Sequence, residues 1–307
     1  MGKPSWKGQI SYALNAIDCR GQSKHQAKIE QGWKPHQPVL GIYSAGEFNT
    51  VFRKGLTFAH WLTLHYPQLH FFRELEAPIL AEFLAEKSET CKASYVGALL
   101  SALRKLQEGL VALEWINEKI ISDEWRVSDH NEIHVPRGAY TQEESQAITQ
   151  QVTGRCSQYG QALRFILSTG ARIDEVFHLR ADKVFVAEGR VELLGKGGKT
   201  RRIKALNPGI LSELNLSRRF VYLEQGNERL WKPGLENMVR EVCDELDIER
   251  RGVHGFRGSA ACELVRIKTE VLGLTESQAR RELAMWLGHN PHRTEVTYAY
   301  VPRGFGA

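Results

Sequence analysis

The chain has 307 residues and is 42% apolar, which is enough material for one large domain or two ordinary ones. A charged fraction of 25% and a mean hydropathy of −0.37 are typical of a soluble globular protein. The most apolar stretch, residues 95–116, is interrupted by charged side chains, so no membrane helix is predicted, and residues 1–20 lack the features of a signal peptide. The net charge of +5 permits a polyanionic partner without requiring one.

The five cysteines are odd in number and widely spaced, and none belongs to a CxxC pair. This pattern disfavours a disulfide framework and a cysteine-based zinc site. We therefore expect a protein of the reducing cytoplasm.

One polar stretch, residues 122–140, lacks helical periodicity and carries Pro136 and Gly138. Directly after it, Thr141 and Glu144 have the spacing of a capping box, which predicts the start of a new helix. We therefore divide the chain near residue 135. The predicted parts are a basic N-terminal arm over 1–45, a helical domain over 46–125, a linker over 126–140 and a second domain over 141–307.

The first domain is predicted to be helical. Residues 1–45 show weak periodicity and are expected to be an irregular, basic arm, either solvated or in contact with a partner. Apolar residues at helical spacing predict a helix over 48–62, one that begins near Pro78, one over 93–106 and a fourth between 110 and 121. In the third helix, Arg104 and Lys105 are expected to face outward.

The second domain mixes helical patterns with a short β region. Residues 183–186, 190–194 and 200–206 predict three strands, with a turn at 187–189. Three strands among helices indicate an α+β domain with a small antiparallel sheet. The whole chain is therefore predicted to be mainly α-helical with one small sheet.

A glycine-rich segment, GKGGKT at 195–200, separates the last two strands. It ends like a phosphate-binding loop, but Leu193 stands where the leading glycine belongs, and the segment does not open a helix, which disfavours an NTPase. The predicted hairpin tip is instead strongly basic, which suits a nucleic-acid backbone, although charges on a sheet edge also keep it soluble. Its cations are Lys196, Lys199, Arg201, Arg202 and Lys204.

Four short motifs each allow a chemical and a structural interpretation. Arg172 stands at the predicted start of a helix, where it suits a phosphate, but pairing with Glu175 explains it as well. The others are an imidazole and a guanidinium three residues apart, a histidine after a helix end, and two tyrosines near the C-terminus. Each alone is typical of capping or packing. These residues are His254, Arg257, His289, Tyr298 and Tyr300.

Taken together and in order, the motifs resemble the tyrosine recombinase (phage-integrase-like) family. TGARIDE, LLGKGGK, HGFR and LGHNPHRTEVTY match its active-site elements over about residues 135–301, and 78–110 resembles its helical core-binding domain. Tyr298 lies nine residues after His289, which is the family spacing, so the resemblance favours it over Tyr300. The implied catalytic set is Arg172, Lys196, His254, Arg257, His289 and Tyr298.

The resemblance implies a DNA strand transferase that uses no metal, ATP or other cofactor. Tyr298 would attack a DNA phosphate as a covalent nucleophile, which gives a 3′-phosphotyrosyl link and a free 5′-hydroxyl. Arg172 and Arg257 would stabilise the added negative charge of the transition state, with a further hydrogen bond from His289.

Two further groups would handle protons in this scheme. Lys196 at the hairpin tip would protonate the leaving 5′-oxygen, and His254 would accept the tyrosine proton or orient the hydroxyl. Contacts to the DNA backbone are predicted for a separate basic set. This set comprises Lys199, Arg201, Arg202 and Lys204 of the hairpin and Arg104 and Lys105 of the first domain.

The implied partner is double-stranded DNA with specific recombination sites, bound in the nucleoid by a dimer to tetramer of the chain, with accessory DNA-bending proteins and without a membrane. Few residues follow Tyr298, which weakens the inference about tetramers. The predicted function is a site-specific recombinase or integrase that integrates or excises a mobile genetic element. Two alternatives stay open: a topoisomerase of type IB chemistry that relaxes supercoils, and a catalytically silent DNA-binding protein on the same fold.

Overall fold

The computed structural model describes residues 5–32, 39–122, 125, 138–195, 198, 200–222 and 228–302, with the backbone alone at 228 and 229. The chain forms two compact units, residues 1–133 and 134–307. Each unit has an apolar core of its own, built from residues between Ile10 and Ile121 in the first and between Tyr140 and Val301 in the second. Among the described residues, no helix is long and apolar enough to cross a membrane.

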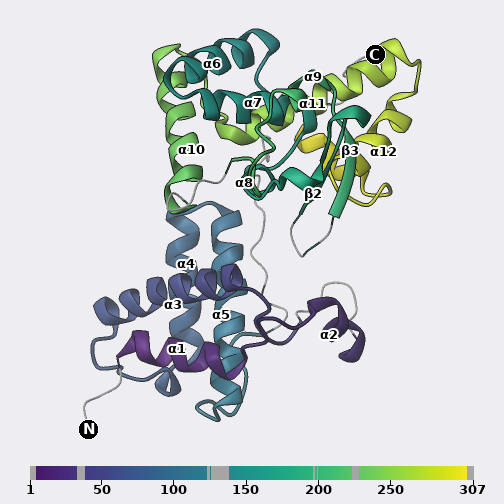
Figure 1. Cartoon of the computed structure of the whole chain (residues 1–307). Coiled ribbons are helices and arrows are strands. Elements are labelled where there is room, and N and C mark those ends of the chain that lie inside the picture. Colours follow the sequence, from purple (N-terminus) through teal and green to yellow (C-terminus); the bar gives the residue numbers. More distant parts are fainter. Residues whose placement is uncertain are drawn as a thin grey trace. The chain divides into compact units, whose positions relative to one another are not determined.

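The first unit is built from helices that pack around α5 (Figure 1). Pro78 lies in the first turn of α4, as the sequence predicts, because its fixed φ suits that position. The helices are α1 (Trp6–Ala16), α2 (Lys24–Glu30), α3 (Ala45–His65), α4 (Ala77–Thr90) and α5 (Ala93–Ala112), with a 3₁₀ turn, η1 (Phe72–Glu74).

The expectation of an irregular arm over residues 1–45 is wrong for the described part of that segment. Helix α1 packs against α3 and α5 and buries Ile10 and Leu14 completely. Its buried face also contains Gln9, whose amide donates to the carbonyl of His70 and accepts from the backbone N–H of Phe72 at 3.0 Å. Gln9 can be buried because its hydrogen bonds are made inside the core, but a polar residue interrupts the apolar periodicity of a short helix. The pattern over residues 6–16 is therefore too weak to predict α1.

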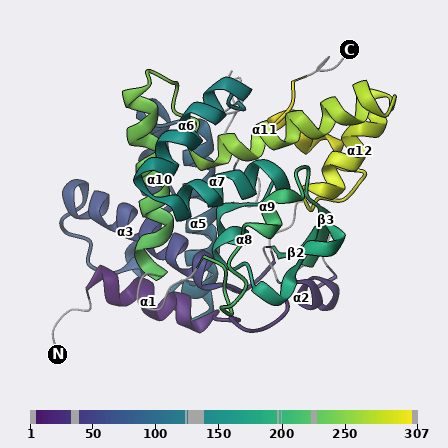
Figure 2. The same cartoon turned by 45° about the horizontal axis from the view of Figure 1, so that its top comes forward.

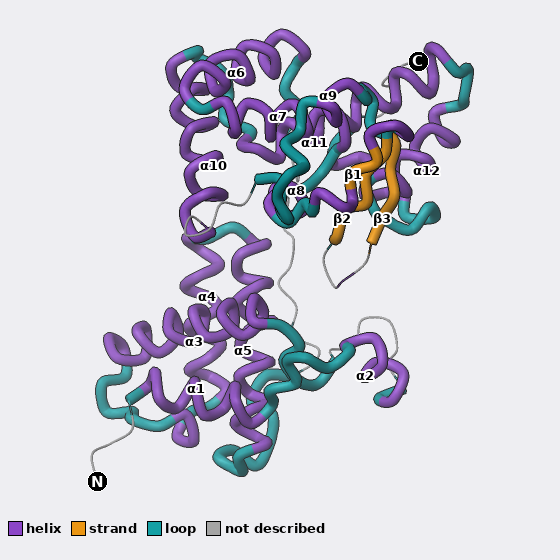
Figure 3. The backbone as a smooth tube through the Cα atoms, viewed as in Figure 1, coloured by secondary structure: helices purple, strands orange, loops and turns teal. Residues whose placement is uncertain are grey.

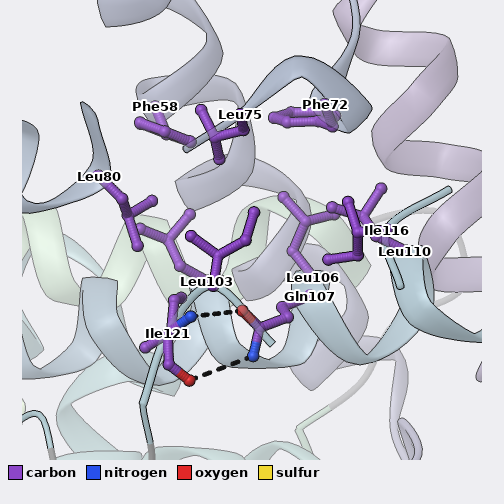
Figure 4. Close-up of a pocket in the computed structure, with 11 residues that line it drawn as sticks. Phe58, Phe72, Leu75, Leu80, Leu103, Leu106, Gln107, Leu110, Ile116 and Ile121 are labelled. Atoms are coloured by element: carbon purple, nitrogen blue, oxygen red, sulfur yellow. Dashed lines mark hydrogen bonds between the residues drawn. The ribbon is translucent and has the colours of Figure 1, made fainter. Parts of the chain in front are cut away.

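The fourth helix expected between 110 and 121 is also absent from the described structure of that segment. Helix α5 continues to Ala112, and Glu114 then adopts a left-handed backbone conformation, with φ of 56°, that ends it. The chain folds back as turns, and Gln107 pairs with both the N–H and the carbonyl of Ile121 (Figure 4). The apolar residues beyond 112, such as Ile116, line a small apolar cavity instead of forming a helix.

Arg104 and Lys105 differ from their predicted outward orientation. Lys105 is buried, and its ammonium donates to the carbonyl of Val39 and to the carboxylate of Glu108. Arg104 donates to the backbone carbonyls of Ser122 and Trp125, at 2.9 and 2.5 Å. A helical pattern does not show that such long side chains can satisfy backbone groups of another segment.

The second unit combines helices with one three-stranded antiparallel sheet in the order β1-β2-β3 (Figure 3). The predicted fold class is therefore confirmed. The elements before the sheet are α6 (Gln142–Arg155), α7 (Ser157–Thr169), α8 (Ile173–Phe177) and η2 (Ala181–Lys183). The sheet consists of β1 (Val184–Phe185), β2 (Arg190–Leu194) and β3 (Thr200–Lys204), with η3 (Val186–Glu188) between the first two strands. The elements after it are α9 (Gly209–Ser212), α10 (Glu228–Glu245), α11 (Gly252–Arg266), the π-helical η5 (Ile267–Val271), α12 (Glu276–Trp286) and η6 (Thr294–Ala299).

Local signals place the helix ends of this unit. Thr141 and Glu144 form the predicted capping box of α6, and Gly170 ends α7 with φ of 57°. Helix α7 packs side by side with α11 (Figure 2). As a result, the turn after Gly170 lies against α11, the helix that carries the HGFR motif.

Candidate active site

Arg257 lies at the centre of the site, on α11, and its side chain is 0% exposed. Its guanidinium donates to the carbonyl of Gly170, at the end of α7, and to that of Leu287, just after α12, the latter at 2.9 Å. Burial lowers the pKa of Arg257 to about 10, so the group keeps its charge at neutral pH. One arginine thus joins the turn that carries Arg172 to the end of the helix that precedes His289.

Glu175 is a buried carboxylate that several arginines share. It accepts from the backbone N–H and the guanidinium of Arg172, at 2.7 and 3.0 Å, and from Arg201 at 2.7 Å. The guanidinium of Arg257 lies 4.0 Å away. Burial opposes ionisation, but the charge of Arg201, the bond from Arg172 and the charge of Arg257 outweigh it and hold the pKa of Glu175 below its ordinary value. Arg172 is therefore paired with Glu175 while its side chain stays 34% exposed.

His289 follows α12 and the left-handed Gly288, which has φ of 80°. Its Nε2 is buried and has no hydrogen-bond partner among the described residues. Burial, together with the charges of Arg172 and Arg257, lowers the pKa of His289. The imidazole is consequently neutral at neutral pH, with one buried nitrogen that has no partner among the described residues.

Of the two tyrosines, the structure brings Tyr300 into this cluster. The Arg257 Nε donates to the Tyr300 hydroxyl at 3.4 Å, and the rings of His254 and Tyr300 are 5.3 Å apart. The ring of Tyr298 lies 4.1 Å from the guanidinium of Arg280. The sequence spacing that favours Tyr298 is therefore not matched by these contacts.

The arrangement can be compared with known proteins. No family model and no curated protein sequence matches the chain. Among solved structures, it is similar to the XerH site-specific recombinase bound to difH substrate in a pre-cleavage complex, with a TM-score of 0.62 and 16% identity over 98% of this chain and 93% of that one. A lambda integrase dimer bound to a COC′ core site gives a TM-score of 0.63 and 13% identity over 94% and 80% of the two chains. The Tn1549 transposon integrase in complex with transposon right end DNA gives a TM-score of 0.56 and 12% identity over 94% of each chain. The chain has the fold of the tyrosine recombinases.

In this tyrosine recombinase fold, the β2–β3 hairpin carries the predicted basic tip, of which Lys196 and Lys199 lie outside the described residues. Arg202 is exposed, although its guanidinium pairs with Glu192, and Lys204 is also exposed. Arg201 differs from the predicted DNA-contacting orientation, because it is buried and donates to Glu175 and to the carbonyls of Gly170 and Trp286.

Strand alternation could have indicated this inward orientation. Arg201 lies on the same side of β3 as the buried Ile203, whereas Arg202 and Lys204 occupy the exposed positions. The role of Glu175 as a counter-ion shared with Arg201 cannot be found from a short motif, because it depends on a contact between segments far apart in the sequence.

Proposed function

We propose that the chain is a site-specific tyrosine recombinase or integrase that cuts and rejoins double-stranded DNA through a 3′-phosphotyrosyl intermediate. The observation that carries the proposal is the convergence of Arg172, Arg257 and His289 from three segments that are distant in sequence, beside the C-terminal segment that carries both tyrosines. Such a cluster offers fixed cationic donors and a nucleophile at one point, which phosphoryl transfer requires.

The proposed reaction balances without an oxidant or an activated cofactor. The tyrosine oxygen forms a bond to phosphorus while the bond from phosphorus to the 5′-oxygen breaks, and the phenolic proton is lost as the 5′-oxygen gains one. We propose that His254, whose ring lies 5.3 Å from that of Tyr300, takes the phenolic proton, and that Lys196, on the family resemblance, supplies the other. The exposed part of Arg172 would bind the non-bridging oxygens, and the unpartnered Nε2 of His289 would add a hydrogen bond.

Arg257 cannot reach a phosphate in the present arrangement, because its side chain is fully covered and its guanidinium already donates to two carbonyls and the Tyr300 hydroxyl. We propose that Tyr298, which has the family spacing from His289, is the nucleophile, and that the Tyr300 hydroxyl moves off Arg257 when a phosphate enters. Tyr300, the tyrosine that contacts Arg257, is the competing assignment.

Covalent trapping tests this function. The wild type, Tyr298→Phe and Tyr300→Phe would be incubated with a tiled panel of nicked duplexes from the DNA that flanks the gene, and an SDS-stable protein–DNA band would be sought. We expect a band that only Tyr298→Phe loses. A band lost only in Tyr300→Phe would keep the reaction and move the nucleophile. Gel-shift binding without any band would favour the catalytically silent DNA-binding protein.

The integration or excision role and the oligomer need a second experiment. Plasmids would carry two copies of a DNA site on which the covalent adduct forms. A recombinase would convert them to recombinant plasmids, whereas a type IB topoisomerase would only relax them. The XerH and lambda integrase structures contain DNA substrates, and lambda integrase is described as a dimer and a tetramer. We propose that this chain also binds double-stranded DNA and assembles on it as a dimer to tetramer. The mass of the protein–DNA complex on a site that forms the adduct would measure the number of chains.

A further inference from the structure

Arg201 of β3 is a cation inside the site that the proposed reaction does not use. Its side chain is 10% exposed. One terminal nitrogen of its guanidinium donates to Glu175 at 2.7 Å and to the carbonyl of Gly170 at 3.3 Å. The other terminal nitrogen donates to the carbonyl of Trp286. One side chain of the sheet therefore joins the turn before α8 to the end of α12.

The sheet and the end of α12 are in contact at further points. The indole Nε1 of Trp286 donates to the carbonyl of Lys204, also on β3, at 3.2 Å. Gly288, which directly precedes His289, packs against the side chain of Arg201, because a Cβ at Gly288 would lie 3.0 Å from the Arg201 Cδ. The backbone that leads to His289 is therefore held against β3.

The charge of Arg201 also acts on Glu175. Three guanidinium groups face this carboxylate: Arg172 at the start of α8, Arg201 on β3 and, at 4.0 Å, Arg257 on α11. Burial opposes ionisation of Glu175, and the charge of Arg201 is the largest of the effects that hold its pKa below the ordinary value. The ionised carboxylate accepts from both the backbone N–H and the guanidinium of Arg172. Arg201 therefore acts on Arg172 through Glu175.

We propose that Arg201 is a positioning residue that orients Arg172 and His289 toward a DNA phosphate. The inference rests on the proposed strand-transfer function and adds to it a residue that acts through Glu175 and Trp286. A buried N–H without a partner costs free energy, and the Nε of Arg201 is such a group among the described residues. Orientation of the site accounts for an arginine at this position better than stability alone.

The test replaces Arg201 and follows adduct formation. Arg201→Met would be compared with wild type and with Arg190→Met, which removes a cation of the neighbouring strand β2 that pairs with Glu188. The measurements are the single-turnover rate of adduct formation on a nicked duplex that wild type cleaves, the dependence of that rate on pH, and the dissociation constant by gel shift. Urea unfolding would define conditions in which each variant is folded.

We expect Arg201→Met to form adduct about 100-fold more slowly, the scale for misplaced reacting groups, with DNA binding within about threefold of wild type. Arg190→Met should match wild type. On acidification, the rate of Arg201→Met should fall at a higher pH than that of wild type, because loss of the cation raises the pKa of Glu175. This fall should be absent from the double variant Arg201→Met/Glu175→Gln, which has no carboxylate to protonate there. General destabilisation would not produce a pH dependence that Glu175→Gln removes.

Arg201→Lys decides the matter where Arg201→Met fails to fold. Lysine keeps a positive charge beside Glu175 but lacks the planar fork that reaches Gly170 and Trp286. Its rate should fall at least about tenfold below that of wild type, with the pH dependence of wild type. A wild-type rate in either variant, or the wild-type pH dependence in Arg201→Met, would overturn the inference alone. DNA binding with no adduct from any protein would instead overturn the proposed function.

Discussion

Glu175 is the residue on which the charge balance of the site depends. It is buried and contacts the guanidinium groups of Arg172 and Arg201, with Arg257 at 4.0 Å. Glu175→Gln removes the negative charge but keeps a side chain of similar size. Loss of one partner from a buried ion pair typically costs about 3 kcal/mol, so urea unfolding at pH 7 should show a loss of that order. Glu213→Gln breaks the exposed pair with Arg164 and should change stability by less than about 1 kcal/mol. Equal effects would show that Glu175 is not a shared counter-ion.

Glu175 also gives the fold a specific pH dependence. Despite the opposing effect of burial, the arginines hold its pKa below the ordinary value in the folded chain. Its contribution to stability is therefore complete above the unfolded-state pKa of about 4.3 and is lost as the pH falls through the lower folded-state pKa. Between these values, the wild type should lose stability on acidification more steeply than Glu175→Gln. Parallel stability–pH curves below about pH 4.3 would contradict this assignment.

His289 offers a spectroscopic test of the phosphate site. In the free chain its pKa is lowered by burial and by the neighbouring guanidinium groups. A bound phosphate brings negative charge to those groups and an acceptor to Nε2, and both effects favour the protonated ring. We therefore expect inorganic phosphate or vanadate to raise the pKa of His289 measured by NMR. An unchanged His289 titration under saturating vanadate would place the anion elsewhere.

For single residues, the sequence predicts which side chains belong to the site better than it predicts where they point. The order of the motifs indicates Arg172, Arg257 and His289, and the structure brings these residues together. The spacing favours Tyr298, but it does not show that Tyr300 contacts Arg257. That contact depends on how the segment packs, to which Arg280 contributes by donating to Thr297 and Val301 from another helix.

At the scale of elements, Gly109 shows why α1 is part of the first unit. A Cβ at Gly109 of α5 would lie 2.0 Å from the carbonyl oxygen of Ala13 of α1, so the two helices approach too closely for any other residue. Gly109→Ala should cost at least about 1–3 kcal/mol in urea unfolding, the range for overpacking. Gly97→Ala is the matched control on the same helix, because its Cβ would meet nothing within 4 Å. Removal of that glycine should stabilise the helix by about 0.5–1 kcal/mol. A tolerated Gly109→Ala would mean that α1 can separate from α5.

Elements with long, regular apolar patterns could be predicted, as α3, α5 and β2 show. The missed helix α1 has a short pattern that Gln9 interrupts, and its burial depends on backbone groups of His70 and Phe72. Conversely, apolar residues beyond Ala112 fill the core from turns, so their spacing predicts a helix that the backbone does not form.

The hairpin carries one cation that pairs inside the protein and others that we propose to contact DNA. Arg201 is 10% exposed and pairs with Glu175, whereas Lys204 is exposed on the opposite side of β3. Lys204→Ala should lower the salt slope of DNA binding by about 1, because it releases one fewer counter-ion. Arg201→Lys should leave that slope unchanged and lower the unfolding free energy, because lysine cannot reproduce the contacts of the guanidinium. A slope lowered by Arg201→Lys would return that residue to the DNA interface.

At the scale of the whole molecule, the residues of the site all belong to one unit. Arg172, Glu175, Arg257, His289 and Tyr300 lie between residues 134 and 307, and the two apolar clusters of that unit contain no residue of the first. A fragment of residues 138–307 should therefore fold alone, with cooperative urea unfolding followed by circular dichroism. Glu175→Gln should lower the stability of this fragment by the same amount as in the full chain, within about 0.5 kcal/mol. A non-cooperative fragment, or a Glu175 effect seen only in the full chain, would show that the site needs the first unit for its structure. The expected result would show that the second unit builds the residues of the site without the first.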